Sequence, residues 1–255
     1  TSDSVERAKA LVESDVDALV IDTAHAHSKG VLEVLNKLKS NFPKIDIVVG
    51  NVATGKGAKF LVDNGADGIK VGIGPGSICT TRMVAGIGVP QISAIMDVKK
   101  ALDKREIKII SDGGIKFSGD IAKALAAGAD AIMMGSIFAG TDESPGKKFK
   151  REGKIFKQYR GMGSIGAMSA GSANRYFQNN YKDKSKFVPE GVEGRVEYKG
   201  KVSKIIYQLQ GGLRSSMGYI GAKYLKEINK RAKFVKITKA GFYESMVHNI
   251  DMVKK

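Results

Sequence analysis

The sequence has little cysteine, no long apolar run and no targeting signal at its start. Cys79 is the only cysteine among 255 residues, so no disulfide can form within the chain, and a reducing, cytoplasmic setting is expected. No run of 18 apolar residues occurs, which predicts no membrane span. Residues 1–6 resemble neither a signal peptide nor an Arg-rich transit peptide. With 42% hydrophobic and 27% charged residues, the chain is a globular protein rather than a disordered one.

Acidic residues are scarce in the second half of the chain. Residues 1–140 hold 17 basic and 16 acidic residues, a balance of +1, whereas residues 141–255 hold 25 and 10, a balance of +15. Such a basic half can bind nucleic acid or an anionic ligand. Most of the cations are lysines without interleaved aromatics, which favours a solvated surface, so nucleic acid is only a minor hypothesis.

One strand–helix pattern recurs through the first half. Residues 11–22, 61–72 and 125–135 each read as the end of an amphipathic helix, a Gly or Asp turn, and a short apolar strand. Two further strands are expected over 45–50 and 107–111, with helix starts at Ser28, Thr54 and Ser118. Apolar strands that alternate with helices predict a parallel sheet covered on both faces.

The predicted fold class is α/β, a (β/α)8 TIM barrel of which only the last five strand–helix units are recognisable. A barrel has eight strands, so we expect that earlier barrel strands are missing from this chain, which is read as one catalytic barrel domain over 1–255. Residues 161–200, rich in Gly, Ser, Asn and Lys, predict a mobile flap. A helical stretch is expected over about 201–231.

The loop over 72–81, Gly-Ile-Gly-Pro-Gly-Ser-Ile-Cys-Thr-Thr, follows a strand and carries the lone cysteine. Its alternating glycines allow the backbone to approach a ligand or to turn carbonyls toward an ion. A structural cysteine is normally buried among apolar residues, so Cys79 in a polar loop is a candidate nucleophile.

Other loops carry weaker signals. Asp112-Gly113-Gly114 and Gly135-Ser136 follow the last two strands, where barrels often hold a phosphate. The pair His25 and His27 has no further ligand to complete a metal site. Residues 50–57 fail as a nucleotide P-loop, because Gly57 stands where Ser or Thr is needed.

Taken together, the cysteine loop, the Asp112 turn, residues 133–136, Tyr159-Arg160-Gly161-Met162-Gly163 and Arg175-Tyr176 resemble the IMP dehydrogenase family along the whole chain. The resemblance implies oxidation of IMP to XMP with NAD, the committed step of guanine nucleotide synthesis, through a covalent cysteine–nucleotide intermediate. It also implies a homotetramer, and the CBS modules that many members carry are absent here. The catalytic residues would be Cys79 as nucleophile, Arg175 as general base, and Tyr176 and Thr81 as its helpers.

The resemblance also implies the remaining site residues. The substrate would be bound by Ser77, Asp112, Gly114, Gly135, Ser136, Tyr159, Gly161, Met162, Gly163 and Glu190. NAD would be bound by Asp22, Thr23, Asn51, Gly72 and Gly74. A K⁺ ion would be held by Gly74, Gly76 and Cys79, with Glu244, Ser245 and Met246 of a neighbouring subunit.

Three alternatives stay open. GMP reductase shares the barrel and much of the cysteine loop, but it lacks the Arg–Tyr flap and carries a glutamate shortly after its Gly-Met turn, which residues 161–167 do not. The other two are a basic protein that binds single-stranded nucleic acid, and an inactive fragment whose five strands leave open edges.

Overall fold

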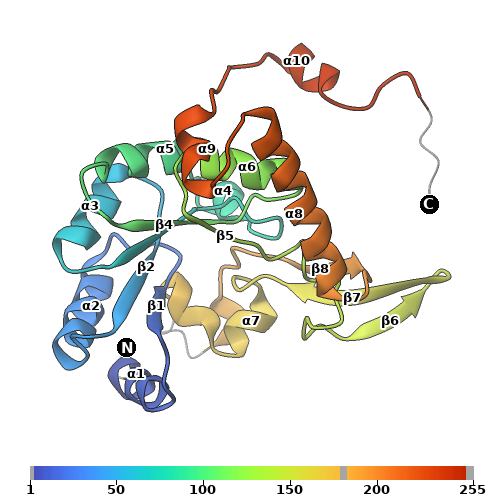
Figure 1. Cartoon of the computed structure of the whole chain (residues 1–255). Helices are drawn as coiled ribbons and strands as arrows, with labels where there is room; N and C mark the ends of the chain where they lie inside the picture. The colour runs from blue at the N-terminus through green and yellow to red at the C-terminus, as the bar shows by residue number, and fades with distance from the viewer. Residues whose placement is uncertain (1–2, 179–182, 251–255) are drawn as a thin grey trace.

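A five-stranded parallel sheet forms the centre of the molecule (Figure 1). This computed structural model describes residues 3–178 and 183–250. The strands follow the order β1-β2-β3-β4-β5, so neighbours in the sheet are also neighbours along the chain. Their bounds are β1 Ala18–Asp22, β2 Asp46–Val52, β3 Gly68–Val71, β4 Lys108–Asp112 and β5 Ala131–Met133. All five carboxyl ends therefore lie along one edge of the sheet.

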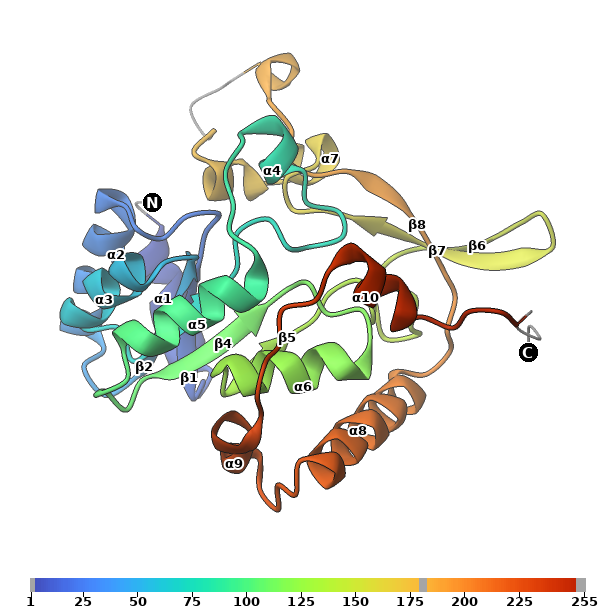
Figure 2. The same cartoon turned by 90° about the horizontal axis from the view of Figure 1, so that it is seen from above.

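Helices connect these strands and cover one face of the sheet, where α3, α5 and α6 lie side by side (Figure 2). Their bounds are α1 Ser4–Glu13, α2 Lys29–Asn41, α3 Gly55–Asp63, α4 Thr81–Val84, α5 Gln91–Ala101 and α6 Ser118–Ala127. Thr54 caps α3 as expected, its side chain accepting from Gly57 N–H at 3.2 Å. Ser28 is the N-cap residue of α2, as expected, although its side chain makes no capping hydrogen bond. The cap predicted at Ser118 is wrong, because Ser118 is the first helical residue of α6 and Phe117 is its N-cap.

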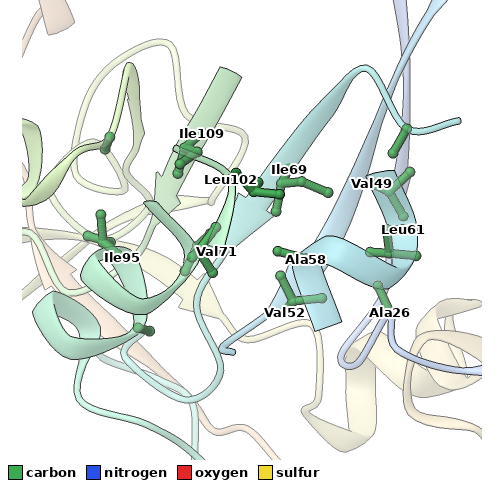
Figure 3. Packing of buried hydrophobic residues seen from close by; sticks show 14 of the residues in the cluster. Ala26, Val49, Val52, Ala58, Leu61, Ile69, Val71, Ile95, Leu102 and Ile109 are labelled. Carbon is green, nitrogen blue, oxygen red and sulfur yellow. The ribbon is translucent and has the colours of Figure 1, made fainter. Parts of the chain in front are cut away.

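The core lies between the sheet and the helices on its covered face. Figure 3 shows Val49 and Ile69 of the sheet beside Leu61 of α3, with Ile95 of α5 and Ile109 of β4 next to them. All five side chains are buried. Every residue of β3 is buried, so the central strand is covered on both faces. This apolar layer fixes the strands and hence the loops that follow them.

The sheet is open rather than closed. Within residues 3–178 and 183–250, no strand pairs with the outer edge of β1 or of β5. The expectation of TIM-barrel units is therefore confirmed only as a parallel α/β sheet of five strands, and a barrel is not formed. The expected cover on both faces fails at the edges as well, because Val20 of β1 is 57% exposed and Met133 of β5 is 45% exposed.

A second sheet follows, where the sequence pattern indicated no strands. It is antiparallel, with β7 between β6 and β8, and the β6–β7 hairpin projects from the body in both views (Figures 1 and 2). The bounds are β6 Lys148–Arg151, β7 Lys154–Arg160 and β8 Glu193–Glu197. The flap region 161–200 is thus partly regular, and it also contains α7 Ile165–Ser169, η1 Ser172–Tyr176 and η2 Lys184–Lys186. Residues 179–182 of that region lie outside the described residues.

The C-terminal part is helical but broken. The single stretch expected over 201–231 is two helices, α8 Val202–Tyr219 and α9 Leu225–Arg231, followed by α10 Lys239–Glu244. The break occurs at Gly221, whose φ of 66° leaves the helical region. Helices α8 and α9 pack on α6. Among the described residues, none of the helices is both long and apolar enough to span a membrane.

Candidate active site

A cavity of about 230 Å³ opens at the carboxyl edge of the parallel sheet. The carboxyl ends of the strands or the loops that follow them contribute to its wall, together with residues of the segment 159–191; β2 contributes Asn51 from within the strand. Nearly all the predicted site residues line it: Asp22, Asn51, Gly72, Gly74, Gly76, Ser77, Cys79, Thr81, Asp112, Gly114, Gly135, Ser136, Tyr159, Gly161, Met162, Gly163, Arg175, Tyr176 and Glu190. Thr23 does not line the cavity, although its neighbours Asp22 and Ala24 do. Its hydroxyl donates to Gly50 O at 3.0 Å.

The cysteine loop starts where the backbone of β3 comes very close to that of β4. Gly72 has φ 149°, and a Cβ at this position would lie 2.2 Å from the carbonyl oxygen of Asp112. Only glycine fits there. Further along the loop, Cys79 is half-buried on the cavity wall. Its Sγ donates to Oγ1 of Thr81 at 3.2 Å, and its N–H donates to Gly76 O at 3.2 Å. The thiol is thus oriented and still reachable from the cavity.

The segment after β7 is folded onto this loop. Thr80 N–H donates to Glu190 O at 2.9 Å, and Cys79 and Gly191 form an isolated antiparallel bridge. At the other side of the cavity, Ala24 N–H donates to Arg175 O at 3.2 Å. These backbone contacts close the cavity from the side opposite the sheet and bring Arg175 and Tyr176 to it.

Arg175 faces the carboxylate that ends β1. Its Nη1 lies 2.6 Å from Oδ1 of Asp22, while its buried Nε has no partner among the described residues. Burial raises the pKa of Asp22, but Arg175 and Lys70 outweigh it, so this pKa lies below its ordinary value. Burial likewise disfavours the charged guanidinium, yet Asp22 and Tyr176 keep the pKa of Arg175 above its ordinary value. Both partners are ionised at neutral pH.

Two tyrosines of the cavity, Tyr159 and Tyr176, have raised pKa values. Burial is the main cause of the raised pKa of Tyr176, with Cys79 and Glu190 adding to it and Arg175 opposing it. Burial also raises the pKa of Tyr159, whose hydroxyl interacts with Ser77. A Cβ on Gly135 would lie 3.0 Å from that hydroxyl, so this glycine leaves room for the ring. Both phenols are therefore neutral donors at physiological pH.

Comparison with known proteins identifies the family. Residues 1–248 match the family model described as the IMP dehydrogenase / GMP reductase domain. The chain belongs to the IMP dehydrogenase / GMP reductase family. It is 56% identical over 254 residues to an inosine-5'-monophosphate dehydrogenase of Aquifex aeolicus, covering 99% of this chain and 51% of that protein. A Chlorobaculum parvum protein of the same name is 54% identical over 256 residues, with 100% and 52% covered.

A solved structure agrees in fold. It is a GMP reductase C318A from Trypanosoma brucei in complex with guanosine 5'-monophosphate, which superposes with a TM-score of 0.90 at 45% identity. The match covers 98% of this chain and 51% of that one. The chain therefore spans about half the length of the family members that it matches.

The sequence reasoning missed one charged residue that lies against the cavity wall. Lys70 of β3 is 2% exposed, and its Nζ lies 2.9 Å from Oδ1 of Asp22 and pairs closely with Oδ2 of Asp112. Asn51 Nδ2 donates to the same Asp112 oxygen at 2.9 Å and to Gly72 O at 2.7 Å. The signal was a lysine inside the strand Gly68-Ile69-Lys70-Val71, which is otherwise apolar.

The predicted ion ligands are split in space. Gly74, Gly76 and Cys79 share the cavity loop. Glu244 is the last residue of the exposed helix α10, which stands off from the sheet (Figure 1), and Ser245 and Met246 follow it; none of these three lines the cavity. In the described part of the chain, no three His, Cys, Asp or Glu side chains are grouped as metal ligands. His25 and His27 are therefore not part of such a group among the described residues.

Proposed function

We propose that this chain forms the active site of an IMP dehydrogenase, which oxidises IMP to XMP with NAD. The observation that carries the proposal is the position of Cys79: the only thiol of the sequence lies on the wall of a cavity that Asp112 and Gly135 also line. Two similar proteins that carry the name inosine-5'-monophosphate dehydrogenase support it. The NAD-dependent reaction on IMP is an inference for this chain, which spans about half of those proteins.

The chemistry begins at the sulfur. A cysteine thiolate is a strong nucleophile, and the reaction uses that form of the side chain. In the proposed reaction Cys79 Sγ bonds to carbon 2 of the hypoxanthine ring, and hydride leaves that carbon for the nicotinamide of NAD. Water then attacks the same carbon, the C–S bond breaks, and XMP is released with NADH and one proton. Thr81 Oγ1, 3.2 Å from Sγ, orients the thiol before attack.

The substrate is oriented by the loops that follow the strands. We assign the phosphate to Ser77, Gly114, Gly135 and Ser136, because backbone N–H groups after parallel strands suit an anion. The free oxygen of Asp112 would accept from the ribose hydroxyls, and the neutral phenol of Tyr159 would donate nearby. Gly161, Met162, Gly163 and Glu190 would border the base, since they line the same cavity.

NAD would enter from the β1 side. Asp22 and Thr23 end β1, Asn51 lies in β2, and Gly72 and Gly74 begin the cysteine loop. The residues fit a nicotinamide riboside, because Oδ2 of Asp22 has no hydrogen bond within the described residues and the buried Oδ1 of Asn51 has no partner there. When bound, NAD supplies the hydride acceptor.

The water step is assigned to Arg175 with Tyr176 and Thr81. In the present conformation Asp22 favours the protonated guanidinium, which works against Arg175 as a base. The proposed role therefore requires the Arg175–Asp22 pair to open before Arg175 accepts a proton from water. We propose that the segment 161–200 moves during turnover for this purpose.

The loop also fits a K⁺ ion. Among the described residues the carbonyls of Gly74 and Cys79 accept no hydrogen bond, and that of Gly76 accepts one, from Cys79 N–H, which leaves it a second lone pair. We propose that these carbonyls hold K⁺ and that Glu244, Ser245 and Met246 of a neighbouring copy complete the site in a homotetramer. A reducing, cytoplasmic setting would keep the Cys79 thiol free.

GMP reductase is the second candidate, favoured by the Trypanosoma brucei structure that is similar over 98% of this chain. Two features argue for the dehydrogenase instead. Arg175 and Tyr176 both line the cavity, and the stretch 161–167 after β7 contains no glutamate. The dehydrogenase forms reduced nicotinamide cofactor, whereas the reductase consumes it, so an absorbance assay distinguishes the two reactions.

The decisive experiment is a mass spectrum of the full protein quenched during turnover with IMP and NAD. We expect an added nucleotide on the peptide that contains Cys79, and neither adduct nor NADH with Cys79→Ala. The same protein is then incubated with GMP and reduced nicotinamide cofactor. NADH formation without a Cys79 adduct would overturn the covalent mechanism, and consumption of the reduced cofactor by GMP alone would favour the reductase.

A further inference from the structure

Lys70 carries a buried ammonium behind the cavity wall, paired with Asp22 and Asp112, which line the cavity, and the proposed reaction has not yet used it. Its side chain is 3% exposed, although a lysine inside a protein normally costs stability unless it is paired. β2 makes room for it, because a Cβ on Gly50 would lie 2.6 Å from the Cβ of Lys70. The two central strands are thus shaped to admit this side chain.

The ammonium bridges two carboxylates from different strands. Nζ pairs with Oδ1 of Asp22, at the end of β1, and with Oδ2 of Asp112, at the end of β4. These aspartates lie on the two sides of the cavity assigned to NAD and to IMP. The charged groups that face them are Lys70 from β3 and Arg175 from η1, with the neutral amide of Asn51 from β2. The cluster holds two cations and two anions.

Each aspartate uses only one oxygen in this network. Asp22 receives both Lys70 and Arg175 on Oδ1, and Asp112 receives both Lys70 and Asn51 on Oδ2. Within residues 3–178 and 183–250, no hydrogen bond is made by Oδ2 of Asp22 or by Oδ1 of Asp112. A shared ammonium therefore fixes both carboxylates and leaves one acceptor oxygen of each for a ligand.

We propose that Lys70 is a positioning residue that holds the carboxylates of Asp22 and Asp112 in place, so that two ribosyl groups are bound side by side, one by each carboxylate. This inference rests on the proposed function for the identity of the two ligands. Because the Lys70 ammonium contacts both carboxylates, it couples the binding of the nucleotide to the binding of the dinucleotide. Without it, two carboxylates that share one ammonium would face each other in a half-buried site.

The test compares Lys70→Gln, which removes the charge, with Lys70→Arg, which keeps it, in the full protein. We expect Lys70→Gln to raise KM for IMP and KM for NAD by about tenfold or more each. We also expect the acidic limb of the pH profile to move to higher pH, because Lys70 is one of the cations that lower the pKa of Asp22. Lys70→Arg should restore the position of that limb. Unchanged KM values and an unchanged acidic limb in Lys70→Gln would overturn the proposal.

Lys39→Gln is the matched control. Lys39 of α2 also pairs with an aspartate, at 2.8 Å, but this partner is Asp67, which directly precedes the amino end of β3, and neither residue lines the cavity. Its loss should leave KM and the pH profile unchanged. Should Lys70→Gln fail to fold, the variant Asp22→Asn is compared with the double variant Asp22→Asn/Lys70→Gln. The double variant removes one cation and one anion, so the cluster again holds equal numbers of each. The double variant should bind IMP at least about fivefold more weakly, and equal affinities would contradict the proposal.

Calorimetric titration of IMP separates this inference from the proposed reaction. IMP binding that depends on Lys70 in a protein that forms no NADH would retain the positioning role and reject the oxidation. NADH formation that is indifferent to Lys70→Gln would do the reverse. A protein that neither binds IMP nor oxidises it would reject both.

Discussion

At the scale of single residues, Arg175 has two roles that require different protonation states: an ion pair with Asp22 and, as proposed, a base for water. The pair with Asp22 at 2.6 Å keeps it protonated and holds η1 against the loop after β1. A base for water must instead be able to accept a proton. If Arg175 performs both tasks in turn, its removal should spare the attack by Cys79 and slow the step that follows.

We therefore predict that Arg175→Ala retains a first burst of NADH but slows steady-state turnover by about 10²-fold or more, with the Cys79 adduct accumulating. Stopped-flow absorbance of NADH and quenched mass spectra measure the two quantities. Arg195→Ala is the control, because Arg195 is an exposed arginine of β8 that lies 5.0 Å from the Phe156 ring. A wild-type rate of adduct hydrolysis in Arg175→Ala would refute the assignment.

Most cavity residues could be predicted from the sequence. The carboxyl ends of parallel strands lie at one edge of the sheet, so the residues that follow the strands come together at that edge. Cys79, Asp112 and Gly135 all follow from this rule. Lys70 does not, because it lies inside a strand, where a lysine is normally taken to face solvent. Only the packing of β1, β3 and β4 shows that its ammonium meets two carboxylates. Burial and pairing depend on partners distant in sequence.

At the scale of elements, helix α6 shows how a cap can be misassigned. Its predicted cap, Ser118, is the first helical residue instead, and the N–H groups of Lys116 and Phe117 donate to Oδ2 of Asp120 at 2.9 and 3.0 Å. We predict that Asp120→Ala lowers the free energy of unfolding by about 1 kcal/mol, whereas Ser118→Ala changes it by less than about 0.5 kcal/mol. Urea unfolding of both variants measures this, and the reverse order would restore the sequence-based cap.

The antiparallel sheet was missed for a different reason. All four residues of β6, Lys-Phe-Lys-Arg, are exposed, so the strand has no buried face and no alternation of apolar and polar residues. What forms it is pairing with β7, together with contacts such as Lys148 Nζ at 3.6 Å from the Tyr198 ring. Periodicity predicts strands that bury one face, and it fails for a hairpin that projects into solvent.

At the scale of the whole molecule, the charge states of buried groups set a pH window for stability. Burial keeps the pKa of Tyr159 and Tyr176 above 10, so stability is lost as pH rises past 10 and the unfolded phenols ionise. Asp22 has a pKa below 3.8, so its stabilising effect is lost as pH falls below 3.8. Between these limits one further group acts near neutrality.

That group is His25, in the loop after β1. Burial, and secondarily the neighbouring His27, lower its pKa from 6.5, so the unfolded chain takes up a proton first as pH falls. Stability should therefore decline once pH drops below about 6.5, well before Asp22 titrates. We predict that His25→Gln flattens the decline in melting temperature between pH 7 and pH 5, while His248→Gln, at an exposed position, leaves it unchanged. Thermal unfolding at a series of pH values measures the effect. A decline that persists unchanged in His25→Gln would contradict the prediction, because the proton uptake that destabilises the protein would then occur at another group.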